Sequence, residues 1–238
     1  MSNSRLARAL VLTAWAGFFG YLWASNDMVR YLGPRTYWVV PFGFITLGAA
    51  AAAHFVALGS ERRSSTGTRA ATGLSRSDLI GIAALILPIV AAAAVPQAEL
   101  GALAVSRKAT GAGATAGFVA PPAPEAGRAP NFIDVHFANE SEEYATTLGI
   151  GDGTELGLVG FVSDSTTAGE FTLTRFYVSC CAADAIPYSV TVVDDQGADF
   201  PDNTWLRVNG VLANDGTEYR LVADGIEEVA EPDSPYLY

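Results

Sequence analysis

The chain has few of the residues that carry enzyme chemistry. Its 238 residues include only two histidines and two cysteines. It contains no Gly-x-Ser-x-Gly turn, no His-Glu-x-x-His motif and no phosphate-binding loop. The usual sequence signs of a serine hydrolase, a zinc protease or a nucleotide-binding enzyme are therefore missing. Carboxylates are abundant enough to pair by chance, and we expect a protein that is not an enzyme.

Basic residues are scarce in the second half of the chain. Residues 131–238 hold 3 Lys and Arg against 20 Asp and Glu, whereas residues 1–130 hold 11 and 5. The chain therefore divides near residue 130 into a basic, apolar part and an acidic part. A strongly acidic domain does not bind nucleic acid, because the phosphate backbone requires positive charge. Nucleic acid is excluded as a partner.

Long apolar runs are confined to the first part. Three of them, at about residues 8–25, 37–59 and 78–97, have the length of about 20 residues that crosses a bilayer. His54 is the one ionisable side chain in their interiors. The sequence predicts a membrane anchor of three transmembrane helices over residues 1–98, with the lipid bilayer as its partner.

The arginines predict which side of the membrane each part faces. Arg5 and Arg8 precede the first run, and four more arginines lie in the loop at 60–77. Positive loops stay in the cytoplasm, so we expect a cytoplasmic N-terminus and an extracytoplasmic C-terminal domain. The alternative that the first run is a cleaved signal peptide stays open.

An Ala/Gly/Pro-rich linker over residues 99–130 is expected to lead into the acidic domain, residues 131–238. Turn signals such as Gly151-Asp-Gly153 separate short apolar segments there, which is typical of a small barrel or sandwich. We predict an all-β domain, a small barrel of the OB type, with one helix at residues 141–148. The expected strands are 132–137, 155–163, 171–180, 189–194, 204–212 and 217–223.

Adjacent cysteines, Cys180 and Cys181, are the candidate site. Consecutive Cα atoms lie about 3.8 Å apart, which is less than the roughly 4.4–6.8 Å that a relaxed disulfide spans. Strand alternation predicts that Cys180 points inward with Phe176 and Val178, and both sulfurs reach one ligand only if the strand bends there. The other readings are a packing role for Cys180 and redox work through a strained disulfide.

Thiolates are ligands for soft metal ions, and the sequence offers two further candidate ligands. Asp184 lies three residues after Cys181, and His136 lies near the start of the domain. We therefore predict Cys180, Cys181, Asp184 and His136 as metal ligands, with zinc or another soft metal ion as the candidate cofactor. The two arginines Arg175 and Arg207 are expected to pair with carboxylates across strands.

The run from Arg175 to Pro187, Arg-Phe-x-x-x-Cys-Cys-Ala-Ala-Asp-Ala-x-Pro, resembles the YcgQ-like small subunits of a bacterial two-component permease. Three other segments carry the same resemblance: Tyr31-Leu-Gly-Pro-Arg35, Trp205-Leu-Arg-Val-Asn-Gly210 and Pro235-Tyr-Leu-Tyr238. The family has His where this chain has Gly33. The resemblance implies that the chain pairs with a multi-span membrane permease, and it assigns no catalytic residue.

These observations together predict an accessory membrane subunit of a permease. Its exported domain is expected to bind a soft metal ion or a thiophilic solute through the two cysteines. Two alternatives from other classes stay open: a structural assembly factor whose cysteines pack in the core, and a thiol redox protein.

Overall fold

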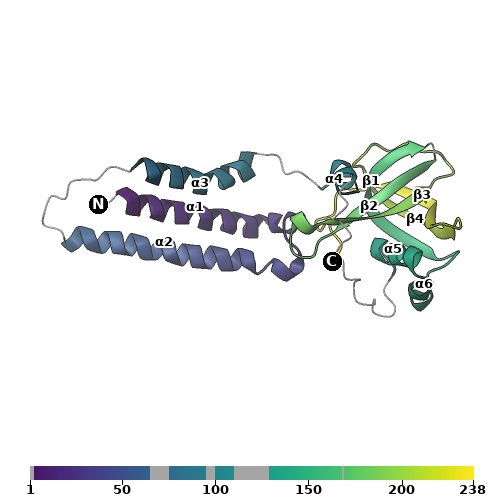
Figure 1. The fold of residues 1–238 in the computed structure, drawn as a ribbon, viewed down its shortest axis with the longest axis horizontal. Coiled ribbons are helices and arrows are strands. Elements are labelled where there is room, and N and C mark those ends of the chain that lie inside the picture. The colour runs from purple at the N-terminus through teal and green to yellow at the C-terminus, as the bar shows by residue number, and fades with distance from the viewer. Residues whose placement is uncertain (1–2, 65–74, 95–99, 110–128, 168) are drawn as a thin grey trace. The chain divides into compact units, whose positions relative to one another are not determined.

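The chain forms two compact units, Met1–Ala98 and Glu99–Tyr238 (Figure 1). The computed structural model describes residues 3–64, 75–94, 100–109, 129–167 and 169–238. Each unit is described by itself below.

The N-terminal unit is helical. It contains α1 (Asn3–Ser25), α2 (Val39–Ser64) and α3 (Arg76–Ala94), and two short 3₁₀ turns, η1 (Asp27–Arg30) and η2 (Pro34–Thr36), join α1 to α2. Among the described residues, Arg5–Ser25 and Pro34–Ser60 are long and apolar enough to cross a membrane. The sequence predicts three transmembrane helices; two helices of sufficient length and apolarity are found among the described residues, and a third span and the membrane anchoring stay predictions. The third predicted span coincides with α3 as far as Ala94, and residues 95–97 lie outside the described residues.

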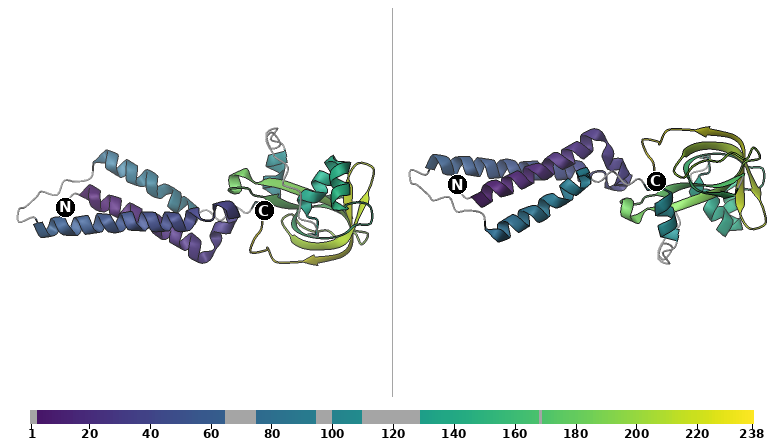
Figure 2. Two further views of the ribbon diagram at one scale, coloured as in Figure 1. Left: turned by 90° about the horizontal axis from the view of Figure 1, so that it is seen from below. Right: turned by 90° about the horizontal axis from the view of Figure 1, so that it is seen from above.

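Helices α1 and α2 pack against each other (Figure 2), and glycines lie at their contact. A Cβ atom added to Gly20 would lie 3.0 Å from the ring of Phe44, and one added to Gly43 would lie 3.2 Å from the ring of Phe19. Each helix therefore places a phenylalanine ring over a glycine of the other. Small residues allow this close approach of helices, as at helix interfaces in membranes.

The third helix is tied to α1 by a polar contact. The indole nitrogen of Trp15 donates a hydrogen bond of 3.0 Å to the carbonyl oxygen of Leu85. Pro88 lies inside α3, where it removes one backbone donor from the helical ladder. A cavity of about 390 Å³ lies between the three helices, and Arg8, His54 and Asp78 are among its lining residues.

The C-terminal unit is built on a closed five-stranded barrel with the strand order β1-β2-β3-β5-β4. Neighbouring strands are antiparallel except β3 and β5, which are parallel. Strand β1 is long enough to pair with β4 through its first half and with β2 through its second. This arrangement is the OB-like barrel predicted from the sequence. The strands are β1 (Glu155–Thr167), β2 (Glu170–Tyr177), β3 (Ile186–Val193), β4 (Trp205–Asn214) and β5 (Tyr219–Glu228).

The strand predicted at residues 132–137 is wrong, because this segment is the helix α5 (Phe132–Glu140). Asn131 caps it by accepting hydrogen bonds from the backbone N–H groups of Ile133 and Asp134, and the Asp134 carboxylate accepts the N–H of Asn131 in return. This capping box fixes a helical start. The predicted helix at 141–148 is confirmed as α6 (Glu142–Leu148).

Helix α5 closes one part of the barrel core with Phe132, which is buried among strand residues. Gly160 of β1 makes room for it, since a Cβ there would lie 2.8 Å from Cζ of Phe132 and 2.7 Å from the carbonyl oxygen of Thr174. Gly210 of β4 lies at the register shift between β4 and β5, where a Cβ would collide with the carbonyl oxygen of Val222. Both glycines are thus required by close backbone approaches.

Part of the predicted linker is structured. Residues 102–109 form the helix α4 (Ala102–Ala109), which packs on the outside of the barrel. Its Ala104 and Val105 contact a second apolar cluster formed by Phe161, Phe176, Val178, Ala185 and Tyr236. We call this the outer cluster. Its residues pack against one another and form a cluster separate from the main apolar core of the barrel.

Candidate thiol site

The two cysteines lie in the connection between β2 and β3. Residues 179–184, which we call the cysteine loop, include the short turn η3 (Ala182–Asp184). Val178 and Ala185 flank the loop on its two sides, and both are buried in the outer cluster. The loop therefore starts and ends at points that packing holds in place.

The prediction that Cys180 points inward is wrong, since Cys180 is exposed and Cys181 is partly buried. Strand β2 ends at Tyr177, so alternation no longer applies three residues later. Beyond that point the chain pairs with the C-terminal tail: the Val178 N–H donates to the Leu237 carbonyl at 3.2 Å, and the Leu237 N–H donates to Phe176 at 2.8 Å. The loop that follows turns out of the sheet.

The turn brings both sulfurs to one side. The Cys180 thiol donates a hydrogen bond to the Sγ of Cys181 at a distance of 3.6 Å, and neither cysteine is in a disulfide. Two sulfurs bound to one tetrahedral zinc at about 2.3 Å each lie about 3.8 Å from one another. The distance between the two sulfurs is thus close to that of a pair bound to one ion. Ligand atoms of Cys180, Cys181 and Asp184 all lie within 4.8 Å of one another.

Asp184 organises the loop through its carboxylate. Oδ1 accepts the N–H of Ser179 at 3.1 Å, and Oδ2 accepts those of Cys180 at 2.8 Å and Cys181 at 3.4 Å. Partial burial acts to raise the pKa of Asp184, but the hydrogen bonds from the Cys180 thiol and from these three amides outweigh it and lower the pKa below its usual value. Asp184 is therefore ionised at neutral pH.

The carboxylate changes the acidity of the neighbouring thiol. Hydrogen bonding to Asp184, and secondly to Cys181, raises the pKa of Cys180 from 9.0 to about 12. Because the thiolate is the reactive and metal-binding form, Cys180 is held as a thiol at neutral pH. A bound cation would remove this restraint, since positive charge favours the thiolate.

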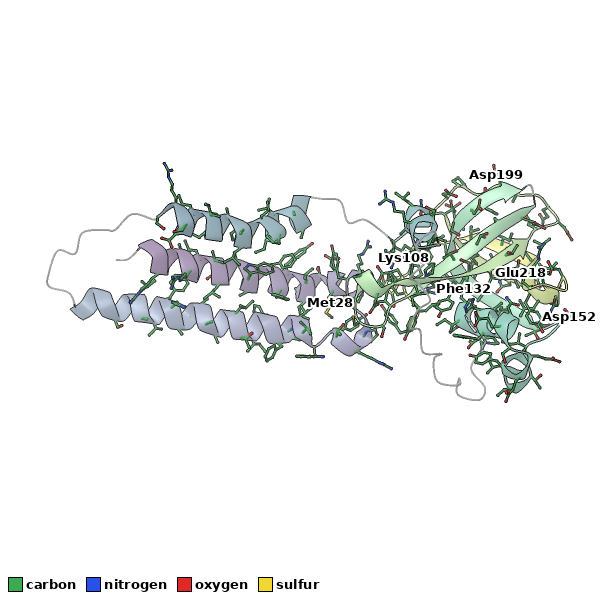
Figure 3. The ribbon with its side chains drawn as sticks, viewed as in Figure 1. Met28, Lys108, Phe132, Asp152, Asp199 and Glu218 are labelled. Carbon is green, nitrogen blue, oxygen red and sulfur yellow. The ribbon has the colours of Figure 1, made fainter. Side chains whose placement is uncertain are left out.

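Helix α4 reaches the cysteine loop through a lysine. The Nζ of Lys108, labelled in Figure 3, donates to the carbonyl oxygen of Ala185 and lies 3.5 Å from that of Ala183. This contact joins residues 75 or more positions apart in the sequence. No sequence pattern indicated it, because Lys108 lies in a segment whose composition is that of a linker.

Arg175 holds the C-terminal tail beside the loop. Its guanidinium donates to three backbone carbonyl oxygens, those of Val159, Ser234 and Pro235, at 3.2, 2.6 and 3.2 Å. The prediction of a carboxylate partner for Arg175 is therefore wrong, because the tail supplies backbone acceptors at that position. For Arg207 the prediction is confirmed: its Nη1 lies 2.5 Å from Oε2 of Glu227.

His136, the fourth predicted ligand, is not brought to the cysteines. It lies on α5, where Nε2 is 3.5 Å from Oε1 of Glu140 and the ring contacts Phe137 and Tyr188 edge to face. Among the described residues, the group of candidate ligands contains Cys180, Cys181 and Asp184 and no histidine.

The barrel domain is similar to a known family. Residues 131–238 match the DUF1980 C-terminal domain. The match covers the β-domain and leaves the helical unit outside it. It agrees with the family resemblance over these residues, and no named relative bears on the pairing with a permease.

No curated protein matches the chain. Among solved structures, the chain is similar to one described as the crystal structure of the S. pombe Stn1–Ten1 complex, with 20% identity and a TM-score of 0.24. The match covers 34% of this chain and 62% of that one, so it spans less than two thirds of the other chain. A similarity at this level carries no statement about what the barrel binds.

Proposed function

We propose that this protein is a membrane-anchored binding subunit of a permease, and that its C-terminal domain captures a soft metal ion or a thiophilic solute through Cys180 and Cys181. One observation carries the proposal: the two sulfurs, neither of them in a disulfide, lie 3.6 Å apart on an accessible loop. That spacing suits two bonds to one ion. The protein binds its solute and performs no chemical conversion.

The anchor in this proposal consists of α1, α2 and α3. Support comes from two helices of sufficient length and apolarity and from the large apolar side chains on their outer surfaces, such as Ile45, Val56 and Ile80. The positive loop at residues 60–77 favours a cytoplasmic N-terminus and an extracytoplasmic barrel. Three helices with few ionisable groups do not make a transport path, so the path belongs to a multi-span partner.

The two alternatives predict different behaviour of the cysteines. If the protein were an assembly factor with packing cysteines, the sulfurs would be buried, whereas Cys180 is exposed. If it were a thiol redox protein, a strained and easily reduced bond between the neighbouring cysteines would be its working form. The exposed position of Cys180 disfavours the packing role, and metal binding by the reduced protein separates ligand binding from redox work.

The proposal is tested with the full-length protein purified in detergent under reducing conditions. Added Cd²⁺ should bind at one equivalent and produce the ultraviolet charge-transfer absorption of cadmium thiolates. Cys180→Ser and Cys181→Ser should each remove that absorption while the thermal transition stays in place, and Ser179→Ala serves as the matched control. Unchanged cadmium binding in both cysteine variants, or none in the wild type, would overturn the proposal.

The role beside a permease needs a cellular test. A strain that lacks the gene should accumulate an altered amount of a soft metal ion when the medium contains it, and the wild-type gene should restore the original level. A gene carrying both cysteine substitutions should fail to restore it although the protein is made at the same level. Equal restoration by both genes would favour the assembly role.

A further inference from the structure

The candidate site has too few protein ligands to enclose an ion. Among the described residues, no His, Cys, Asp or Glu beyond Cys180, Cys181 and Asp184 belongs to the cluster. Structural zinc sites are closed by four protein ligands, and sites that exchange a ligand keep a position open. Even with all three groups counted, the cysteine loop falls short of a closed tetrahedral site.

Asp184 is already engaged by the loop itself. A carboxylate has about four lone-pair positions for hydrogen bonds. Three of them take the backbone N–H groups of Ser179, Cys180 and Cys181, and the Cys180 thiol donates to the same group. Turning the carboxylate towards an ion would take these acceptors away from three amides of the loop and would loosen the turn that places the two sulfurs.

The loop has a stable frame in which the sulfurs stay in place without a third protein ligand. Val178 and Ala185 anchor it in the outer cluster, and Lys108 holds the carbonyl of Ala185. The side chain of Cys180 is exposed, so a ligand from another molecule has access to an ion on the two sulfurs.

We propose that Cys180 and Cys181 form an open two-sulfur site, that Asp184 is a positioning residue, and that the cargo is a soft ion passed by ligand exchange with thiols of another molecule. This inference rests on the proposed function and specifies its chemistry. A divalent ion that arrives as a thiol complex exchanges its thiols for the two protein sulfurs. The two protons of Cys180 and Cys181 pass to the departing thiolates, so no oxidant or reductant is required.

The test uses full-length protein loaded with Cd²⁺ in detergent. X-ray absorption should count two sulfur neighbours for the bound ion, with oxygen from water completing the shell. Addition of glutathione should raise that count to three while cadmium stays on the protein. At higher glutathione concentration, the rate of cadmium release should rise in proportion to the thiol concentration, because the incoming thiol enters an open position.

Asp184→Asn distinguishes positioning from ligation. We expect the bound cadmium to keep two sulfur neighbours and an unchanged charge-transfer absorption, because a residue that orients the ligands does not itself bind the ion. A release rate independent of glutathione, or four protein ligands around cadmium in the wild type, would overturn the open site while leaving the proposed function intact. Absence of cadmium binding in the wild type would instead overturn the proposed function itself.

Discussion

The guanidinium of Arg175 donates a hydrogen bond of 2.6 Å to the carbonyl oxygen of Ser234, 59 residues further along the chain. Arg175 lies on β2, two residues before the strand ends, and its Cζ is 5.9 Å from the ring centroid of Trp205. The tail that it holds supplies the backbone partners of Phe176 and Val178. The cysteine loop therefore begins next to the point where Arg175 holds the C-terminal tail by hydrogen bonds.

Replacement of Arg175 by Met should destabilise the barrel unit, because three carbonyl oxygens lose a charged donor. We expect a loss of about 2–4 kcal/mol in the free energy of unfolding. Denaturant unfolding of the full chain, followed by near-ultraviolet circular dichroism, measures it. Arg207→Met removes an exposed ion pair and should cost less than about 1 kcal/mol. Equal losses for the two variants would contradict the role given to the tail.

Asp184→Asn should make Cys180 more reactive. The carboxylate raises the pKa of Cys180 to about 12, so its removal lowers that pKa and increases the thiolate fraction at pH 8. A fall of one pKa unit gives about a tenfold higher thiolate fraction, and the thiolate is the form that reacts. Iodoacetamide labelling of Cys180, followed by mass spectrometry, measures the rate. Asp202→Asn is the control, and a slower reaction in Asp184→Asn would refute the argument.

Gly43→Leu should weaken the pairing of α1 and α2. A Cβ at Gly43 lies only 3.2 Å from the ring of Phe19, whereas one at Gly48 meets nothing within 4 Å. We expect Gly43→Leu to cost about 1–3 kcal/mol through overpacking and Gly48→Leu to cost much less. Unfolding by a denaturing detergent, monitored by tryptophan fluorescence, compares the two. Similar unfolding midpoints for both variants would show that the contact between the Phe19 ring and Gly43 does not stabilise the pairing of α1 and α2.

Asp215, in the turn between β4 and β5, should titrate far below an ordinary aspartate. Hydrogen bonds from the Thr217 hydroxyl and from the backbone N–H groups of Glu218 and Thr217 lower its pKa from 3.8 to about 2. Because the folded-state pKa is depressed, the turn gains stability above pH 3.8 and loses it as the pH falls through about 2. Backbone chemical shifts of residue 217 during an acid titration report the midpoint.

Thr217→Val removes the hydroxyl that contributes most to this effect, so the midpoint for Asp215 should move up towards 3.8. Thr147→Val serves as the control, since its hydroxyl donates to the Glu143 carbonyl in a different element. An unchanged midpoint in Thr217→Val would assign the low pKa of Asp215 to the backbone donors and to the charge of Arg220.

The sequence was sufficient to predict the barrel because the pattern that marks each strand lies within a few neighbouring residues. Short apolar segments between turn residues mark each strand, and the predicted strand at 204–212 lies inside β4 apart from its first residue. The prediction failed at residues 132–137, because the apolar residues that suggested a strand belong to the helix α5. The distinguishing signal was present in Asn131 and Asp134, which form the capping box, and apolar content alone does not separate a short strand from a short buried helix.

The sequence predicted where the cysteine pair lies and that the chain must turn there, but not the contacts that hold the loop. Adjacency of Cys180 and Cys181 drew attention to the loop, and the expected need for a turn agrees with the end of β2 at Tyr177. The contacts that set the loop come from distant parts of the chain, such as Lys108 on α4 and Leu237 in the tail. Alternation and spacing describe neighbours in sequence, so they carry no information about such partners.

The paired rings and glycines of α1 and α2 also have a mechanical consequence. Phe19 lies over Gly43 and Phe44 lies over Gly20, so a shift of either helix by one turn, about 5.4 Å, would remove both rings from both glycines at once. The two helices consequently have a single register in place of a series of neighbouring ones.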